Sequence, residues 1–412
     1  MNNNSVYELI RLAFFGMEPS FNDDMKLVYD EFYAHGIASL MSDVFNKLPL
    51  DDLLKSQWMS HIVRQIYIFM NIVSEQEKLN ELMDSESIPF VIIKGTAAAQ
   101  YYQTPINRSM GDIDILVKPQ DFSKACDLFD KSEFKLLSEI TPYERHARYE
   151  KNGVIYELHY FFASMNDAHA AQALDEILIK GIDKRVVIEV EGKKFPALPD
   201  FENGLVLLQH INQHLENGLG LRQIIDWMMY VICYLDDNNW KEFEPVVERI
   251  GLKELAITLT KMCQIYLGLP SMVTWCDNAD KQLCSTLMDY IMQRSNMING
   301  KIDDTSYLIG LFSKRLSVIA WFKLLQSNGK QHWKLAKYPV FRPFAWLYQI
   351  IRYIVKGISR DNALSAIKYE YKQSRMRTKL FERLGVKCKA KGLAFRDGSK
   401  FVIRKTDNNN KK

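Results

Sequence analysis

Two short stretches of the chain decide its fold: Phe90-Val-Ile-Ile-Lys94-Gly95 and Gly111-Asp112-Ile113-Asp114-Ile115-Leu116-Val117. Both contain a run of β-branched and apolar residues that is typical of a buried strand. The glycine that ends the first stretch permits a sharp turn, and Thr96 after it suits the start of a helix. The two stretches therefore predict two strands joined through a turn and a short helix.

The residues around these strands predict a mixed α/β unit. Apolar residues at helical spacing predict a helix over residues 121–134, and alternating residues predict a further strand over 154–160. Two short runs separated by Glu-Gly predict a hairpin between residues 186 and 195. We therefore expect residues 89–200 to form one small mixed-sheet core.

The remainder of the chain favours helices. In residues 1–88, large apolar side chains recur every three or four positions, and several segments of 201–330 suit the helices of a bundle. Residues 331–412 are rich in basic and aromatic residues, and we expect helices there that end in a polar, disordered tail. The predicted fold class is α+β, a small sheet embedded in a mostly helical chain of four regions.

The charge of the chain is divided unevenly along its length. Hydrophobic residues make up 47% and charged residues 25% of the 412, which excludes wholesale disorder and collagen-like repeats. The net charge of +3 combines +17 on residues 330–412 with −14 on residues 1–329. A basic C-terminal fifth joined to an acidic body is a distribution that proteins use to meet an anionic partner.

The cellular compartment is predicted from the absence of targeting and membrane-spanning signals in the sequence. The first residues have neither a basic segment nor a sustained apolar segment, so we expect no secretory signal, and no apolar run is long enough to cross a membrane. Six cysteines occur without a CxxC motif. We therefore expect reduced thiols in a cytoplasmic protein, with peripheral contact at the inner membrane as an option for the basic region.

The strand face that carries Asp112 and Asp114 is the most chemically informative feature. Residues two apart on a strand share one face, about 6.5–7 Å apart along the backbone. Carboxylates so placed repel each other unless a cation lies between them, and magnesium takes hard oxygen ligands of this kind. A solvated strand face is the alternative. Glu157 on a later strand favours the metal site, because it can converge on the same ions.

These motifs together resemble the nucleotidyltransferases of the DNA polymerase beta superfamily. The chain is still more similar to an uncharacterised nucleotidyltransferase family of bacterial genomes. The resemblance covers about residues 75–230, and the residues that carry it are Ile88-Pro-Phe-Val-Ile-Ile-Lys94-Gly95, Tyr101-Tyr102…Pro105…Arg108, Asp112-Ile-Asp114-Ile-Leu-Val117, Glu157-Leu-His159, His210…His214 and Arg222…Asp226.

The resemblance implies a catalytic role for three acids and a polymerase beta-like core. Asp112 and Asp114 would ligate two magnesium ions, with manganese as an alternative, and Glu157 would complete the site as a ligand or as the base. Such a pair of ions stabilises both the attacking and the leaving oxygen of an in-line displacement. The substrate implied is a nucleoside triphosphate (NTP).

Four further residues are candidates for binding the nucleotide. By the resemblance, Gly95 and Thr96 would hold the β- and γ-phosphates through backbone N–H groups and a hydroxyl. Lys94 and Arg108 are candidate counter-charges for the phosphates, with a structural ion pair as the alternative for each. Thr96 departs from the superfamily, which has glycine or serine there.

The remaining polar residues of these motifs are candidates for supporting the nucleotide-binding cleft. His210 and His214 are spaced to share a helix face, which suits a zinc ion or simple packing beside Arg222 and Asp226. No third zinc ligand stands near them, so we expect packing or hydrogen bonding. His159 shares the strand face of Glu157, either next to the metal ligands or as a structural histidine.

Two functions follow from the sequence. The first is a magnesium-dependent nucleotidyltransferase that moves a nucleoside monophosphate from NTP to a hydroxyl of a sugar, a small molecule or a protein. The alternative is a non-catalytic protein that binds nucleic acid or an anionic membrane surface through residues 331–412, where aromatic and basic residues alternate. Docking of this basic region on the acidic body is a third use of the same charges.

Overall fold

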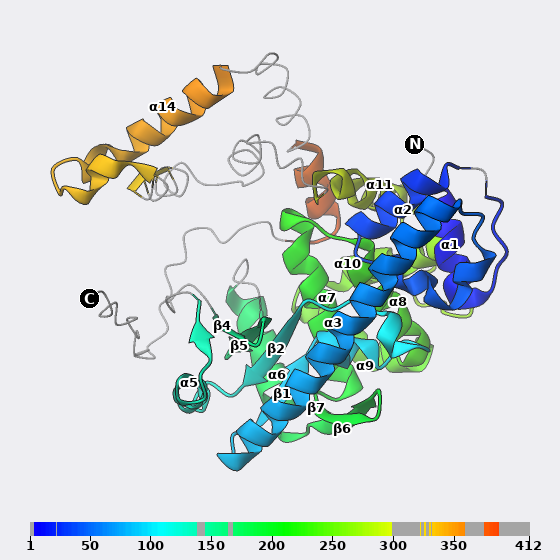
Figure 1. Ribbon diagram of the computed structural model, residues 1–412, viewed down its shortest axis with the longest axis horizontal. Helices are drawn as coiled ribbons and strands as arrows, with labels where there is room; N and C mark the ends of the chain where they lie inside the picture. Colours follow the sequence, from blue (N-terminus) through cyan, green and yellow to red (C-terminus); the bar gives the residue numbers. More distant parts are fainter. Residues whose placement is uncertain are drawn as a thin grey trace. The chain divides into compact units, whose positions relative to one another are not determined.

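The computed structural model describes residues 4–21, 23–137, 145–163, 168–298, 332–358 and 375–386, and a few single residues between 322 and 330 (Figure 1). The described residues form two compact units. Apart from Ala168, residues up to Asn296 belong to the first unit and those from Met297 onward to the second. The spacing of apolar residues also predicts helices over 309–325 and 363–384, and most of the first, more than half of the second and the predicted disordered tail lie outside the described residues.

A seven-stranded mixed sheet forms the centre of the first unit, in the order β3-β4-β5-β2-β1-β7-β6. The strands are β1 (Phe90–Ile93), β2 (Asp112–Val117), β3 (Lys135–Leu136), β4 (His146–Lys151), β5 (Val154–His159), β6 (Val186–Val190) and β7 (Lys193–Ala197). β2 pairs with β5 and β1 with β7 in parallel, and the other neighbours are antiparallel. The predicted strands, the hairpin and the α+β class are confirmed.

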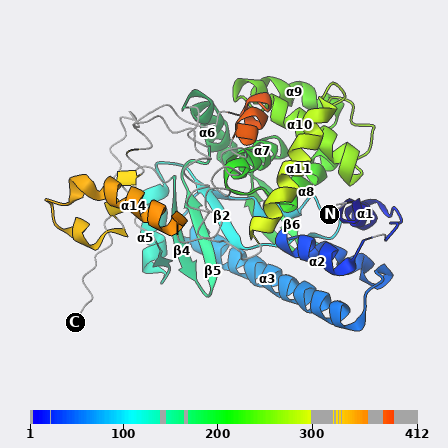
Figure 2. The same cartoon turned by 90° about the horizontal axis from the view of Figure 1, so that it is seen from above.

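The helices of the first unit lie on both sides of this sheet, as Figure 2 shows for α3 and α7. Their bounds are α1 (Asn4–Phe15), α2 (Met25–Ala34), η1 (Ala38–Lys47), α3 (Asp52–Ser85), α4 (Gly95–Ala99), η2 (Pro105–Asn107), α5 (Phe122–Lys131), α6 (Ala168–Asp183), α7 (Asp200–Asn217), α8 (Leu221–Cys233), α9 (Asp237–Arg249), α10 (Lys253–Met262), η3 (Cys263–Leu267) and α11 (Lys281–Ile298).

One hydrophobic core cluster lies on one face of the sheet. Ile113, Ile115 and Val117 of β2 pack there with residues of α3 and α5, such as Phe69 and Phe129, and all five side chains are fully buried. Because side chains alternate along a strand, Asp112 and Asp114 lie on the opposite face. That face is the one toward α7 and α8, and it carries the candidate site.

Three elements in or near the sheet were not predicted from the sequence, namely the two-residue strand β3, the strand β4 and the helix α6. β4 reads His-Ala-Arg-Tyr-Glu-Lys, and only Ala147 and Tyr149 of it are buried, so its apolar signal is short. It nevertheless pairs with β5 along its whole length. α6 was missed as well. The absence of β4 from the prediction matters because one of its side chains reaches the candidate site.

The second unit contains η4 (Lys334–Lys337), η5 (Arg342–Phe344) and α14 (Ala345–Ile358), in agreement with the helices expected in residues 331–412. None of the described helices in either unit is long and apolar enough to cross a membrane.

His35, at the end of α2, forms a hydrogen bond to the start of α8, and we expect this contact to be sensitive to acid. Its Nδ1 accepts a hydrogen bond from the Leu221 backbone N–H at 3.1 Å, and the side chain is buried. Burial lowers the pKa of His35 to about 4. Because the folded pKa lies below the unfolded one, this neutral histidine supports the fold above about pH 6.5, and that support is lost as the pH falls toward 4.

We expect the wild-type protein to lose about 3 kcal/mol of stability through His35 between pH 7 and pH 4. His35→Asn should remove this part of the pH dependence, because the amide keeps an acceptor for Leu221 and does not titrate. Urea unfolding at a series of pH values measures the effect, and His169→Asn at an exposed position is the control. Equal pH profiles for wild type and His35→Asn would contradict the assignment.

Candidate active site

The sheet brings the three predicted acids together. In the parallel pairing of β2 with β5, Asp114 lies opposite Glu157 and Leu116 lies opposite His159. Since residues two apart share a face, Asp112, Asp114, Glu157 and His159 all point away from the core. Two strands separated by about forty residues of chain thus supply one polar cluster.

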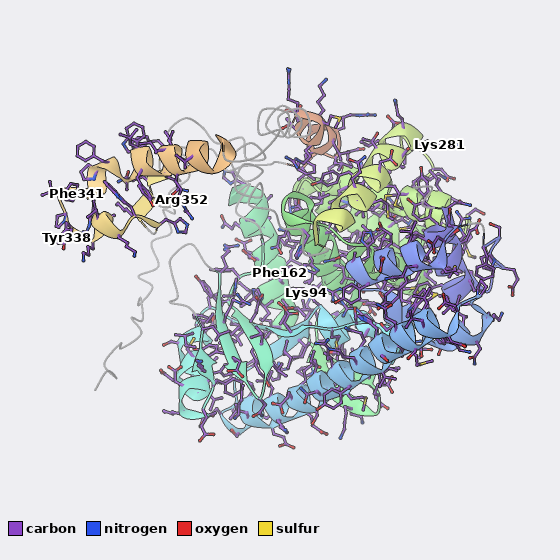
Figure 3. The ribbon with its side chains drawn as sticks, turned by 45° about the horizontal axis from the view of Figure 1, so that its top comes forward. Lys94, Phe162, Lys281, Tyr338, Phe341 and Arg352 are labelled. Carbon is purple, nitrogen blue, oxygen red and sulfur yellow. The ribbon has the colours of Figure 1, made fainter. Side chains whose placement is uncertain are left out.

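Lys94 lies directly on this cluster. Its Nζ is 2.5 Å from Oδ1 of Asp114, and its side chain is 12% exposed, so the two charges form a buried ion pair. The ammonium also lies 5.5 Å from the ring centre of Phe162. Both residues are labelled in Figure 3. Lys94 has φ 56°, a conformation that L-residues rarely adopt, and this turn before α4 is what directs it toward β2.

Further basic side chains compensate the other acids. Nε of Arg148, from β4, is 3.2 Å from Oε1 of Glu157. Nε2 of His159 is 3.0 Å from Oδ1 of Asp114 and 3.6 Å from Oε2 of Glu157. The carboxylates of Asp114 and Glu157 are therefore held by cations and an imidazole of the same chain.

The charges move the pKa values of the two aspartates in opposite directions. Repulsion from Asp114, together with burial, raises the pKa of Asp112 to about 6. Burial alone would raise the pKa of Asp114 as well, but the Lys94 ammonium and the His159 hydrogen bond outweigh it and hold that pKa well below its usual range. Asp114 is thus the permanently charged centre, and Asp112 is the acid that is costly to ionise.

A cavity of about 220 Å³ opens over the cluster. Its lining consists of Lys94, Gly95, Arg108, Met110, Gly111, Asp112, Asp114, Glu157, His210, His214, Arg222 and Gln223. Ligand pockets are usually about 300–1,000 Å³, so this volume suits part of a nucleotide rather than the whole. Most candidates from the sequence therefore meet in one cavity.

Arg108 lines this cavity but is already paired. Its Nε and Nη2 donate to the two carboxylate oxygens of Asp226 at 2.7 and 2.8 Å, and both side chains are buried. The Tyr102 hydroxyl donates to the same carboxylate at 2.7 Å. Arg108 and Asp226 therefore form a buried pair that fixes α8 to the loop before β2.

Arg222 has fewer polar contacts than Arg108. It lies one helical turn before Asp226 on α8, and its Nη1 donates to the Ser109 carbonyl at 3.4 Å. Within the part of the chain that the structure describes, it has no carboxylate at ion-pair distance. Burial, followed by the charge of Arg108, lowers its pKa.

Two predicted phosphate ligands have different surroundings. Gly95 lines the cavity with φ 32°, and this backbone angle favours glycine. Thr96 is fully buried, and its hydroxyl donates to Oε1 of Gln76 at 3.0 Å, so that hydroxyl is turned away from the cavity.

His210 and His214 lie on α7 and face the acids across the cavity. Their rings are perpendicular with centres 4.5 Å apart. Burial and the nearby Lys94 charge lower the pKa of both, so both imidazoles are neutral at pH 7. Among the described residues, neither belongs to a group whose geometry could hold a metal ion, whereas Asp114, Glu157 and His159 form such a group, with their donor atoms within 4.8 Å of one another.

The sequence did not point to Arg148 or Gln223 as residues of this site. Arg148 was missed because β4 was missed, and an Arg two residues from a His on a strand facing Glu157 was the available signal. Gln223 lines the cavity next to Arg222, where the helical spacing alone gives no chemical signal.

Comparison with known proteins defines the class to which this fold and site belong. Residues 22–268 match the family described as uncharacterised nucleotidyltransferases, which is more than half of the chain. The chain therefore belongs to this nucleotidyltransferase family. The match contains the whole sheet and every residue of the cavity.

Other comparisons add little. One solved structure that resembles the chain is an antigenic nucleotidyltransferase-like protein from Paracoccidioides brasiliensis, at 15% identity and a TM-score of 0.31. The similarity covers 49% of this chain and 95% of that one. No curated protein sequence matches the chain.

Proposed function

We propose that the protein is a divalent-metal-dependent nucleotidyltransferase of the DNA polymerase beta type. It transfers a nucleoside monophosphate from NTP to a hydroxyl of an acceptor such as a sugar, a small molecule or a protein. The observation that carries the proposal is the meeting of Asp112, Asp114 and Glu157 beside the Arg222 guanidinium in one cavity. This constellation lies inside the region that matches a nucleotidyltransferase family.

The donor atoms of the cluster fit a divalent ion. Carboxylate oxygens are the ligands that Mg²⁺ and Mn²⁺ take, and an Asp114 oxygen, a Glu157 oxygen and a His159 nitrogen lie within 4.8 Å of one another. Asp112 at the same cavity would complete a set that holds two ions. When bound, such ions would neutralise the charge that builds on the transferring phosphate.

The chain's own residues would bind and orient the substrates. We assign the triphosphate to Arg222, because this guanidinium has no carboxylate partner among the described residues, and to the Lys94–Gly95 turn. Arg108 acts through Asp226, which keeps α8 and hence Arg222 in place. Glu157 is the candidate base for the acceptor hydroxyl, at the cavity wall.

The proposal is tested by incubating the full-length protein with each of four α-³²P-labelled NTPs, Mg²⁺ or Mn²⁺, and pools of sugars, small metabolites and proteins. We expect label on one acceptor class and release of pyrophosphate. Arg222→Met should raise KM for the NTP more than it lowers kcat. Arg249→Met, at an exposed position on α9, is the matched control. No transfer together with no nucleotide-induced shift in melting temperature contradicts the proposal.

A second candidate role is favoured by the second unit, whose residues 329–358 contain six Lys and Arg and no acidic residue. On α14 the buried Ala345 and Gln349 mark one side, and Leu347, Ile351 and Val355 are exposed at a spacing of four. Tyr338 and Phe341, labelled in Figure 3 together with Arg352, are exposed in the same unit. Apolar and aromatic side chains among cations are typical of a helix lying on an anionic membrane surface.

We therefore expect the protein to float with vesicles of phosphatidylglycerol and phosphatidylcholine but not with phosphatidylcholine alone, and to be released by salt. Leu347→Glu combined with Ile351→Glu should abolish flotation. Leu53→Glu, on the exposed side of α3, should not. Binding to DNA or RNA without flotation would contradict the membrane role in favour of nucleic acid.

A further inference from the structure

His159 is placed as a ligand rather than as a neighbour of the site. It ends β5, and its side chain is 8% exposed, so almost all of the imidazole is shielded from solvent. Its Nε2 touches both acids of the cluster, at 3.0 Å from Asp114 and 3.6 Å from Glu157. The parallel register fixes this arrangement, because His159 follows Glu157 by two residues on the same strand face.

We propose that Asp114, Glu157 and His159 hold one divalent transition-metal ion in preference to Mg²⁺. Mg²⁺ is bound through oxygen, whereas imidazole nitrogen is a good ligand for first-row transition metals. The inference rests on the proposed function for the place of the site and concerns only the ion that the protein itself holds. An ion that arrives with the nucleotide near Asp112 is a separate matter.

Lys94 increases the preference for a transition metal over Mg²⁺. Its ammonium lies 2.5 Å from the same Asp114 oxygen that His159 contacts, so an incoming ion competes with a positive charge for this carboxylate. Mg²⁺ has only the two carboxylates to gain, and one of them is shared with Lys94. A transition metal gains the imidazole nitrogen as well, which lies 3.0 Å from the Asp114 oxygen.

The test measures metal binding directly, without nucleotide. Full-length protein freed of metal by a chelator is titrated with Co²⁺ and separately with Mg²⁺ by calorimetry, and the visible absorption of Co²⁺ reports the ligands. We expect one Co²⁺ to bind at least about tenfold more tightly than Mg²⁺. His159→Asn should weaken Co²⁺ by at least about tenfold and leave Mg²⁺ within about threefold. His61→Asn, on α3 and outside both the cavity and the Asp114, Glu157 and His159 cluster, is the matched control.

A second variant keeps the test decisive if His159→Asn does not fold. Lys94→Met removes the competing charge, so Co²⁺ affinity should rise by about tenfold or more. Lys118→Met, which removes a lysine paired with Asp183 outside the cavity, should have no effect. The inference is overturned if Mg²⁺ binds wild type as tightly as Co²⁺, if His159→Asn keeps its Co²⁺ affinity, or if Lys94→Met leaves it unchanged.

These outcomes are separable from those of the proposed function. Selective Co²⁺ binding without any nucleotide transfer would uphold the metal site and contradict the transfer reaction. Transfer that runs equally well on Mg²⁺, with no Co²⁺ preference in binding, would do the reverse.

Discussion

Asp112→Asn and Asp114→Asn are each expected to reduce nucleotidyl transfer by about a thousandfold or more, and to change stability in opposite directions. Loss of transfer is expected because each variant removes a carboxylate that we propose holds an ion, and such ions supply several kcal/mol to the transition state. The opposite changes in stability follow from the electrostatics of the folded protein alone.

Asp112→Asn should stabilise the metal-free protein at pH 7.5. Repulsion from Asp114 raises the pKa of Asp112 to about 6, so its ionised form costs free energy of folding that a neutral amide does not. The shift corresponds to at most about 3 kcal/mol, and solvent at this half-buried position reduces it to about 1–2 kcal/mol. The stabilising effect should shrink as the pH falls below 6, where Asp112 itself becomes neutral.

Asp114→Asn should destabilise the same protein. The pKa of Asp114 is held low because its charge is paired with Lys94 and hydrogen-bonded to His159, so its contribution to stability is present above the unfolded pKa of about 3.9 and is lost on protonation. We expect a loss of about 2–4 kcal/mol, because the variant leaves the Lys94 ammonium without its closest partner. Melting temperatures in a chelating buffer measure both variants, and a change of the same sign for both would contradict this account.

Asp226→Asn is expected to cause the largest loss of stability, about 3–5 kcal/mol. Asp226 and Arg108 have side chains only 2% and 5% exposed, and two hydrogen bonds join them, so removal of one charge leaves a guanidinium buried without its counter-ion. The Tyr102 hydroxyl loses a charged acceptor at the same time. Because α8 carries both Asp226 and Arg222, binding of NTP should weaken as well.

A surface pair provides the control for this measurement. Lys26 and Asp30 form an ion pair whose side chains are 49% and 46% exposed, and Asp30→Asn should cost less than about 1 kcal/mol. Urea unfolding followed by intrinsic tryptophan fluorescence, to which the buried Trp227 on α8 contributes, measures both variants. If Asp226→Asn unfolds at the same urea concentration as Asp30→Asn, the buried pair does not hold α8.

The sequence predicted the strands of the core because their signals are local. The apolar runs of β1, β2 and β5 are each buried on at least one face, and the Glu-Gly turn of the β6–β7 hairpin has a recognisable pair of residues. β4 was missed because its burial alternates over six mostly polar residues, and pairing with β5 stabilises it more than its own composition does.

The acidic residues of the candidate site could be predicted from the sequence, whereas the partners of its basic residues could not. Asp112, Asp114 and Glu157 stand in motifs, whereas the partner of a basic residue depends on contacts between distant segments. Arg108 and Asp226 are 118 positions apart in the chain, and neither local sequence indicates that the two side chains form a pair. The same holds for Thr96, whose hydroxyl is directed to Gln76 on α3 rather than into the cavity.

The parallel pairing of β2 with β5 also determines when the site can exist during folding. Antiparallel neighbours such as β6 and β7 are joined by a tight turn and can form early, but β2 and β5 meet only after the intervening chain has closed into a long loop. No isolated fragment that ends before β5 contains Asp114, Glu157 and His159 together. If these residues hold the ion that we propose, the return of metal binding during refolding would report on completion of the sheet, later than the return of helical signal.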